Sequence, residues 1–321
     1  MSHLIDVIIP MYNRADCVLN IIRQLENQTF KDFRAIFVND GSTDNTAEVL
    51  EQELQKAKFD FTVITKLNGG AGSARNAGIR ASDSQWISFV DSDDELRPQF
   101  LEYLYSAATS SGSDLAICDM MTRFKDESAE TEPLGDLRYN TITPAEAMKH
   151  FCTKWFGPWG LFMNREMAFE NELFFDENCI YNEDAPYISE VIAACNKVAK
   201  VDMKLYVYIL SNGSLHRSPR LDKFLSAVES FKKTEEKLLS TKNDAAKVFN
   251  EMGGARFYIA TLRRAAVQLS IKDFKTLENE IKFKEYKYQF KNLQLSQKIA
   301  CYLFLFSKTF FYYAMKSVFN D

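Results

Sequence analysis

The sequence has few of the residues that form covalent cross-links or soft-metal sites. It contains only three histidines, and its six cysteines include no Cys-x-x-Cys pair. The cysteines are Cys17, Cys118, Cys152, Cys179, Cys195 and Cys301. Scattered cysteines of this kind argue against a disulfide framework or a cysteine zinc site, and they are typical of thiols kept reduced in the cytosol.

Positive charge is also in short supply. The chain has 39 lysines and arginines against 44 acidic residues, a formal net charge of −5, which argues against a dedicated nucleic-acid binder. The N-terminus has no basic segment followed by a long apolar core, so we expect no signal peptide and a protein on the cytoplasmic side. The 321 residues, 46% of them hydrophobic, suffice for a catalytic domain with a smaller appendage.

The glycine-rich segment at Gly69, Gly70 and Gly72 lacks the features of two phosphate-binding motifs. No Gly-Lys-Ser/Thr ending follows it, as a phosphate loop requires, and it follows the third predicted strand, whereas a dinucleotide fingerprint follows the first. Arg75 and Asn76, one helical turn further on, are better suited to reach a phosphate or a carboxylate. An ion pair between Arg75 and a nearby aspartate is the structural alternative, and the two interpretations are compatible.

Short apolar runs alternate with helical patterns over the first part of the chain. Strands are predicted at residues 5–9, 33–38, 59–65, 86–90 and 114–118, with helices between them. This alternation predicts an α/β fold with a parallel, doubly wound sheet. Ligands of such sheets bind outside the carboxyl ends of the strands. Because polar clusters follow these strands, we expect the clusters to converge on one cleft.

Three carboxylates follow the strand at residues 86–90. Asp91, Asp93 and Asp94 lie within four residues, with Ser92 between them. Carboxylates this close raise one another's pKa, and a divalent cation that prefers hard oxygen ligands, Mg²⁺ or Mn²⁺, relieves the repulsion. The alternative is a solvated acidic turn that caps the next helix. The expected convergence of the polar loops favours the metal site.

A second pair of carboxylates, Glu183 and Asp184, opens a helix predicted to end near residue 194. A helix N-terminus stabilises an ionised carboxylate, which is the form that a general base requires. Simple N-capping by Asp184 is the alternative. His216 follows in a loop that can close over the cleft. Trp155 and Trp159, beside glycine and proline, are predicted to be core, with a sugar-stacking platform as the alternative.

From about residue 219 the pattern becomes helical, with helices predicted at 221–240, 243–270 and 273–285. We therefore place a domain boundary near Arg217, between a catalytic domain at 1–217 and a helical region at 218–321. Near the end, an apolar run at 299–316 is interrupted by Lys308. As a helix this run would span about 25 Å, less than the ~30 Å hydrocarbon core of a bilayer.

A helical wheel separates the basic residues of this run from its aromatic residues. Lys298, Lys308 and Lys316 gather on one side. The opposite side carries Leu303, Phe304, Phe310, Phe311 and Ala314. A basic, aromatic, amphipathic helix suits the surface of an anionic bilayer. A packed helix or a homo-oligomer interface is the alternative.

Several motifs in a fixed order resemble those of the family 2 glycosyltransferases with the GT-A fold, of the type that builds bacterial surface polysaccharides. The resemblance covers about residues 4–217. It rests on Ile9-Pro10-Met11-Tyr12-Asn13-Arg14, on Val38-Asn39-Asp40-Gly41-Ser42-Thr43-Asp44-Asn45-Thr46, on Asn68 through Ala74-Arg75-Asn76, on Asp91-Ser92-Asp93-Asp94 and on Glu183-Asp184.

The resemblance implies a role for each matching residue. The first loop and Asp40 would hold the uridine of a UDP-sugar, Asp91 and Asp93 the metal, and Asp184, beside Glu183, would act as the base. His216 is assigned to the metal as well. The residues implied in nucleotide-sugar binding are Pro10, Tyr12, Arg14, Asp40, Asn68, Gly70, Arg75, Ser92 and Asp94.

The implied function is a metal-dependent inverting transfer of one sugar from a UDP-sugar to a glycan hydroxyl. The acceptor would be lipid-linked, and the enzyme would lie peripherally on the inner membrane face. A catalytically silent UDP-sugar-binding subunit is the alternative. A nucleotidyltransferase would need glycines that Tyr12-Asn13-Arg14 lacks.

The chain departs from the pattern of the family it resembles at two positions. Ile209 and Leu161 stand where relatives often have Arg and Lys, so the diphosphate would need contacts from Ser214, His216 or Arg217.

Overall fold

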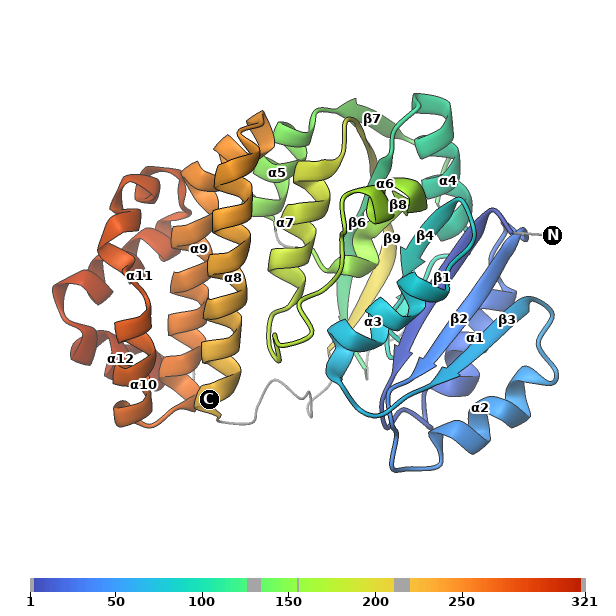
Figure 1. Ribbon diagram of the computed structural model, residues 1–321, viewed down its shortest axis with the longest axis horizontal. Coiled ribbons are helices and arrows are strands. Elements are labelled where there is room, and N and C mark those ends of the chain that lie inside the picture. Colours follow the sequence, from blue (N-terminus) through green and yellow to red (C-terminus); the bar gives the residue numbers. More distant parts are fainter. Residues whose placement is uncertain (1–2, 126–133, 155, 211–219, 319–321) are drawn as a thin grey trace. The chain divides into compact units, whose positions relative to one another are not determined.

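The structure is a computed structural model that describes residues 3–125, 134–154, 156–210 and 220–318 (Figure 1). These residues form two compact units, which are taken separately below. The sheet unit comprises residues 1–144, 156–177 and 194–212, and the helical unit comprises residues 145–155, 178–193 and 213–321. The domain boundary near Arg217 stays a prediction, since residues 211–219 lie outside the described part of the chain.

One half of the sheet is parallel. The strands β1 (Ile5–Met11), β2 (Phe33–Asn39), β3 (Asp60–Thr65) and β4 (Trp86–Phe89) lie in the order β3-β2-β1-β4. Except at the edge strand β3, almost every residue of these strands is buried, as strands covered on both faces require. The connecting helices are α1 (Val18–Glu26), α2 (Thr46–Leu54) and α3 (Gly70–Ala81). This half agrees with the predicted strands at 5–9, 33–38, 59–65 and 86–90.

The other half of the sheet is mixed. It contains β5 (Glu95–Leu96), β6 (Leu115–Phe124), β7 (Tyr139–Ile142), β8 (Leu161–Asn164) and β9 (Val198–Leu210). Strand β8 lies antiparallel between β4 and β6, while β6 and β9 are parallel partners. The sequence pattern predicts β6 but not β8, because four residues after a single 3-10 turn (Pro158–Gly160) carry no periodic signal.

Helices cover the sheet closely. Helix α3 packs against β1 and β2 and is drawn across them in Figure 1, while α4 (Phe100–Ser111) packs against β6 and β9. At Gly78 of α3, an added Cβ atom would lie 2.3 Å from Cγ2 of Ile8, so glycine is needed for this approach. The short α6 (Arg165–Glu170) follows β8 and is capped by Asn164.

The helical unit is built mainly from α5 (Pro144–Thr153), α7 (Asp184–Ala194), α8 (Leu221–Thr241), α9 (Asp244–Gln268) and α10 (Ile271–Glu280). Asn243 and Ser270 cap α9 and α10 through their side-chain oxygens. The helices predicted at 221–240 and 243–270 are therefore confirmed. The third ends earlier than predicted, and a 3-10 helix, η3 (Phe283–Asn292), follows it.

The end of the chain differs from the single helix that the sequence pattern predicts. Helix α11 (Leu295–Phe306) ends at Ser307, whose φ of −155° and ψ of 109° are extended, and α12 (Lys308–Val318) then begins. Phe304 and Phe311, expected on one exposed apolar face, are buried and in contact within the protein. In the described part of the chain, no helix has both the length and the apolar character needed to cross a bilayer.

Candidate functional site

The candidate site lies in the sheet unit, at the carboxyl ends of neighbouring strands. Strands β2, β1 and β4 are adjacent and parallel, so the polar segments that follow them meet at one edge of the sheet. These segments are the loops at 12–17, 40–45 and 91–94. The convergence that the order of the motifs predicts is therefore present, and the contacts below describe it.

Asn13 joins the first two loops. Its φ of 51° lies in the left-handed region, where Asn is one of the few residues tolerated besides Gly. Its side-chain oxygen accepts hydrogen bonds from the backbone N–H groups of Thr43 (2.8 Å) and Asp44 (3.3 Å), and its own N–H donates to the Ser42 hydroxyl (3.0 Å). The two loops consequently hold each other in place.

Asp40 holds the glycine-rich segment. Its buried carboxylate accepts hydrogen bonds from the backbone N–H groups of Gly69 (3.0 Å) and Gly70 (2.8 Å) and from Lys66 Nζ (2.7 Å). The Asn68 side chain donates to the Asp40 carbonyl oxygen (2.9 Å). Both carboxylate oxygens are thus engaged by the chain itself, and a contact between Asp40 and uridine stays a prediction.

The acidic segment is paired with two arginines. Arg75 Nη2 donates to Asp91 Oδ1 at 2.8 Å, which confirms the ion pair weighed from the sequence. Arg14 Nη2 donates to Asp93 Oδ2 at 3.0 Å. Because Arg14 comes from the loop after β1 and Arg75 from α3, the two ion pairs join three motifs that are far apart in the sequence.

Asp94 is buried and turned inward. Its carboxylate accepts hydrogen bonds from the Tyr206 hydroxyl (2.8 Å) and from the Ile209 backbone N–H (2.8 Å). Burial, followed by the charges of Asp91 and Asp93, raises the pKa of Asp94 to about 8. Tyr206 also accepts a hydrogen bond from the Asp91 backbone N–H (3.1 Å), so one tyrosine positions both ends of the acidic segment.

The donor set suits a divalent metal. Among the described residues no three His, Cys, Asp or Glu side chains are grouped to hold a metal ion, but the carboxylates of Asp91 and Asp93 are hard oxygen ligands, and a diphosphate would add further oxygens. Burial and then the charge of Asp91 raise the pKa of Asp93, a shift that a bound cation opposes. His216, the third predicted ligand, lies outside the described residues.

The other predicted site residues are placed as follows. Pro10 lies in β1 opposite Val38, Tyr12 follows the strand and is half-buried, and Ser92 is buried between Asp91 and Asp93. In the helical unit, Asp184 is the first residue of α7 and Glu183 precedes it, both half-buried. The helix N-terminus predicted for this pair is therefore confirmed, whereas its role as a base stays a prediction.

Three supporting residues were missed by the sequence interpretation. Tyr206 stacks on buried Trp159 with ring centroids 4.4 Å apart, which makes that tryptophan part of the core as predicted, whereas Trp155 lies outside the described residues. Lys66 pairs with Asp40, and Glu177 accepts hydrogen bonds from Ser73 (3.0 Å) and Asn76 (2.9 Å) of α3. Only Lys66, two residues before the Asn68 motif, had a local signal.

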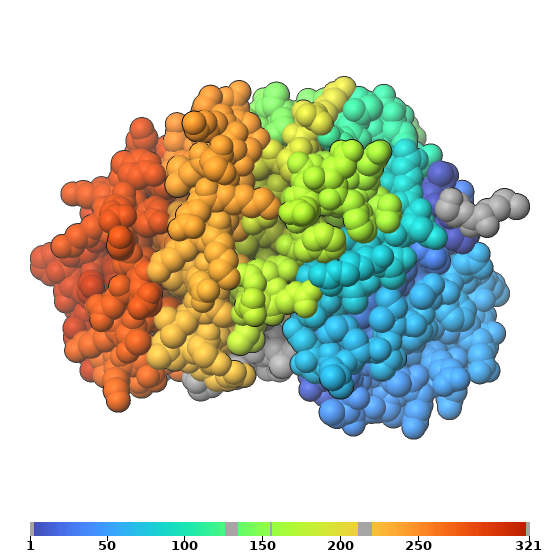
Figure 2. Space-filling model, in the orientation of Figure 1, coloured from blue at the N-terminus to red at the C-terminus, as the bar shows by residue number. Residues whose placement is uncertain are grey.

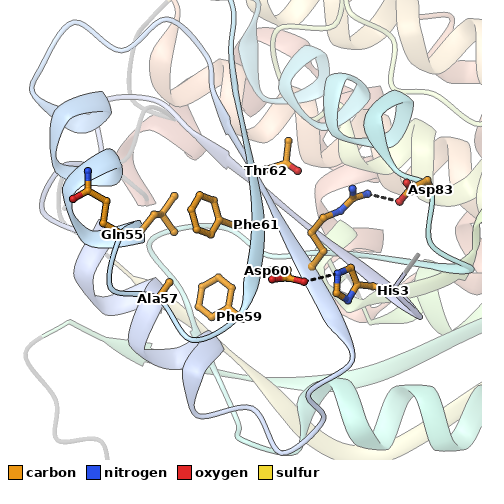
Figure 3. Close-up of a pocket in the computed structure, with 10 residues that line it drawn as sticks. His3, Gln55, Ala57, Phe59, Asp60, Phe61, Thr62 and Asp83 are labelled. Atoms are coloured by element: carbon orange, nitrogen blue, oxygen red, sulfur yellow. Dashed lines mark hydrogen bonds and ion pairs between the residues drawn. The ribbon is translucent and has the colours of Figure 1, made fainter. Parts of the chain in front are cut away.

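A pocket of about 570 Å³ lies elsewhere in the sheet unit (Figure 3). Its lining comes from the amino ends of the strands, for example Asp60 at the start of β3, and from the carboxyl end of α2, and not from the motif loops. Its side chains pair with one another: His3 contacts Asp60 at 3.0 Å and Arg34 contacts Asp83 at 2.6 Å.

Comparisons with known proteins agree with this geometry. The sequence model described as "Glycosyl transferase family 2" matches residues 6–173. The "Uncharacterized glycosyltransferase EpsJ" of Bacillus subtilis is 30% identical over 224 residues, which are 68% of this chain and 64% of EpsJ. The chain thus spans slightly less than two thirds of the length of this and other curated relatives.

Solved structures share the fold. The S. aureus TarS 1–349 structure in complex with UDP has a TM-score of 0.72 at 17% sequence identity. The match covers 100% of this chain and 91% of the TarS chain. The UDP-GlcNAc complex of the same protein has a TM-score of 0.71 at 17% sequence identity, and the match covers 100% of this chain and 92% of the TarS chain. The mannosyltransferase PcManGT of Pyrobaculum calidifontis, in complex with GDP-Man and Mn2+, has a TM-score of 0.58 at 13% sequence identity. The match covers 96% of this chain and 88% of the PcManGT chain. The predicted GT-A fold is confirmed.

Proposed function

Because the chain belongs to glycosyl transferase family 2, we propose that it moves one sugar from a UDP-sugar to a hydroxyl group of a glycan acceptor. The observation that carries this proposal is the joining of the three motif loops through Arg14, Arg75 and Asp40 at one edge of the sheet. The uridine part is supported by the TarS structures, which contain UDP and UDP-GlcNAc and match this chain over its whole length.

Asp91 and Asp93 are the residues proposed to hold Mn²⁺ or Mg²⁺. A cation there would neutralise the charge on the departing diphosphate, and the presence of Mn2+ in the PcManGT complex supports this assignment. Arg14 and Arg75 already lie beside these two carboxylates, so both guanidinium groups are near enough to serve phosphate oxygens when a donor binds. Arg is well suited to this because its planar fork matches phosphate.

The proposed reaction is an in-line displacement. The bond between C1 of the donor sugar and the diphosphate breaks while the acceptor oxygen forms a bond to C1 from the opposite face, which inverts the anomeric centre. Asp184, beside Glu183, is proposed to take the proton of the acceptor hydroxyl, and UDP leaves. An α-linked donor would thereby give a β-linked product.

The acceptor is proposed to be a lipid-linked saccharide of a surface polysaccharide, modified at the cytoplasmic face of the membrane. The relatives support only the general class: EpsJ is called a glycosyltransferase, and TarS is a poly(ribitol-phosphate) β-N-acetylglucosaminyltransferase. Assembly of the chain into a homo-oligomer is part of the same proposal.

The test is the release of UDP from a panel of UDP-sugars with Mn²⁺, without acceptor. We expect slow hydrolysis of one donor, lowered about 100-fold or more by Asp93→Ala and by Asp184→Asn. Asp60→Asn is the matched control, because Asp60 is an exposed acid at the amino end of β3 that pairs with His3; it should leave the rate unchanged. Equal rates in all four proteins would refute the assigned roles.

A catalytically silent UDP-sugar-binding subunit is the competing function. It predicts that UDP binds, that Asp93→Ala weakens this binding, and that no donor is hydrolysed even when a glycan acceptor is added. Calorimetric titration with UDP, run beside the release assay, separates the two functions.

A further inference from the structure

Helix α11 exposes a continuous apolar stripe. Leu295, Ile299, Tyr302 and Phe306 follow one another at spacings of four, three and four residues, which places them on one face of the helix. Their exposed fractions are 75%, 52%, 55% and 87%. The opposite face, with Ala300, Cys301 and Phe304, is buried in the helical unit. Helices that are apolar on both faces are normally covered on both.

The exposure is concentrated in this part of the molecule. Eight of the fifteen large apolar side chains that are exposed in the described residues lie between residues 288 and 318. On α12, Phe310 and Tyr313 add aromatic rings that are more than half exposed. The C-terminal helices, coloured orange to red, form part of the molecular surface in Figure 2. Single exposed apolar residues are ordinary, but a cluster of this size marks an interaction surface.

The charge of the same segment is strongly positive. Residues 281–318 contain seven lysines and one acidic residue, Glu285, in a chain whose net charge is −5. The lysines are Lys282, Lys284, Lys287, Lys291, Lys298, Lys308 and Lys316. Those of η3 and its flank, 282, 284, 287 and 291, are exposed. An occupant of this surface must therefore accept aromatic side chains and carry negative charge.

We propose that the surface formed by η3, α11 and α12 docks on an anionic phospholipid bilayer. Tyr and Phe side chains suit the boundary between headgroups and acyl chains, and the exposed lysines of η3 and its flank match phosphate groups. The inward burial of Phe304 and Phe311 means that the inserting residues are the α11 stripe, not the face that the helical wheel selects. The charge complementarity favours a bilayer over a second copy of this chain, because a symmetric pairing would bring the lysines of two copies together.

The test is co-sedimentation with vesicles of phosphatidylcholine alone and of phosphatidylcholine mixed equally with phosphatidylglycerol. The intact chain should bind the anionic vesicles and bind the neutral ones weakly. Replacing Ile299, Tyr302 and Phe306 together by Ser should lower partitioning about tenfold or more. Replacing Lys284, Lys287 and Lys291 by Gln should lower binding to the anionic vesicles by about fivefold per lysine.

The matched control is Leu239→Ser, which removes a large apolar side chain that is 57% exposed on α8, outside the proposed surface. It should bind vesicles as the intact chain does. Each variant is first checked for unchanged helical circular dichroism. Equal binding of the stripe variant and the control, or a dimer in light scattering that the stripe variant abolishes while no protein binds vesicles, would overturn the proposal.

The bilayer proposal and the proposed reaction fail separately. UDP release by the stripe variant in vesicle-free solution should equal that of the intact chain, because none of its substituted residues belongs to the donor site. Loss of vesicle binding with normal UDP release confirms the surface. Vesicle binding without UDP release from any donor, even with a glycan acceptor added, leaves the surface intact and refutes the reaction.

Discussion

Some charged side chains of the two units are satisfied in different ways. In the sheet unit, Arg75 pairs with Asp91, and the buried Asp40 accepts from the backbone N–H groups of Gly69 and Gly70. In the helical unit, ion pairs such as that of Glu278 with Lys308 also occur, but two charged side chains lie against aromatic rings and hydroxyls. Lys223 Nζ lies 4.6 Å from the centroid of the Tyr181 ring, and Glu235 accepts from two tyrosines.

In the sheet unit a polar network holds the loops in place, whereas in the helical unit the packing of side chains holds the helices. The loops of the sheet unit carry little apolar surface, so their geometry depends on individual hydrogen bonds. The helices are held by large rings, such as the stacked pair Phe231 and Phe257 with centroids 3.8 Å apart. Removing one polar atom should therefore disturb the first unit more than the second.

Replacing one carboxylate in each unit by an amide tests this difference most directly. Asp40→Asn should lower the free energy of unfolding by about 3 kcal/mol, because an amide presents its NH₂ group to donors that the buried carboxylate now satisfies. It should also weaken UDP binding, since the glycine segment loses its anchor. Glu235→Gln should cost less than about 1 kcal/mol, because an amide oxygen still accepts from the tyrosine hydroxyls.

Urea unfolding of both variants and calorimetric titration with UDP provide the measurements. Two results would contradict the comparison. One is an Asp40→Asn variant with unchanged stability and UDP affinity, and the other is a Glu235→Gln variant that loses as much stability as Asp40→Asn.

A second comparison adds one methyl group to each unit. In Gly78→Ala the new Cβ would lie 2.3 Å from Cγ2 of Ile8, a buried β-branched residue in the middle of the sheet that is stiff about χ1. In Gly254→Ala it would lie 2.3 Å from Cε1 of Tyr286, a partly exposed ring that can shift. Both replacements gain about 1 kcal/mol of helix preference. We expect a net loss of about 2 kcal/mol for Gly78→Ala and less than half of that for Gly254→Ala.

Thermal unfolding gives the order of the two variants directly. Gly135→Ala serves as the reference, because an added Cβ atom there meets nothing within 4 Å. A melting temperature for Gly254→Ala below that of Gly78→Ala would mean that the helical unit is the more rigid of the two.

The polar network was partly predictable because its signals are local. The motif residues stand directly after apolar runs, and parallel strands bring such positions to one edge, so the grouping of Arg14, Arg75 and Asp93 follows from chain order. The contact between Tyr206 and Asp94 does not, because 112 residues separate the two and β9 reaches Asp94 only by pairing with β5. Long-range pairing of this kind has no signature in a single sequence.

The end of the chain was harder to predict for a physical reason. Periodicity assigns an apolar face only if the helix is continuous. The extended backbone at Ser307 shifts the phase of everything after it, and neither Ser307 nor its neighbours are helix breakers such as Gly or Pro. The apolar content of the tail was therefore visible in the sequence, while the choice of which aromatic rings face outward required the structure.

The smallest predicted effect is a pair of opposite pH dependences. Burial would raise the pKa of Glu177, but hydrogen bonds from Asn76, Arg80 and Ser73 outweigh it and lower the pKa. The stabilisation by Glu177 is therefore complete above the pKa that this residue has in the unfolded chain. It is lost as the pH falls through the lower pKa that Glu177 has in the folded protein. Burial, only partly offset by Tyr286 and Tyr258, raises the pKa of Glu235. Stability should then fall as the pH rises from the unfolded to the folded pKa of Glu235.

Urea unfolding between about pH 3 and pH 7 would separate the two carboxyls through Glu177→Gln and Glu235→Gln. At neutral pH, Glu177→Gln should be less stable than the intact chain by roughly 0.5 kcal/mol, since the group is partly exposed, and this difference should vanish in acid. For Glu235→Gln the stability relative to the intact chain should instead improve as the pH rises, because the amide never ionises in its partly buried site. Parallel pH profiles for the two variants would contradict the prediction. They would mean that folding shifts the pKa values of Glu177 and Glu235 in the same direction.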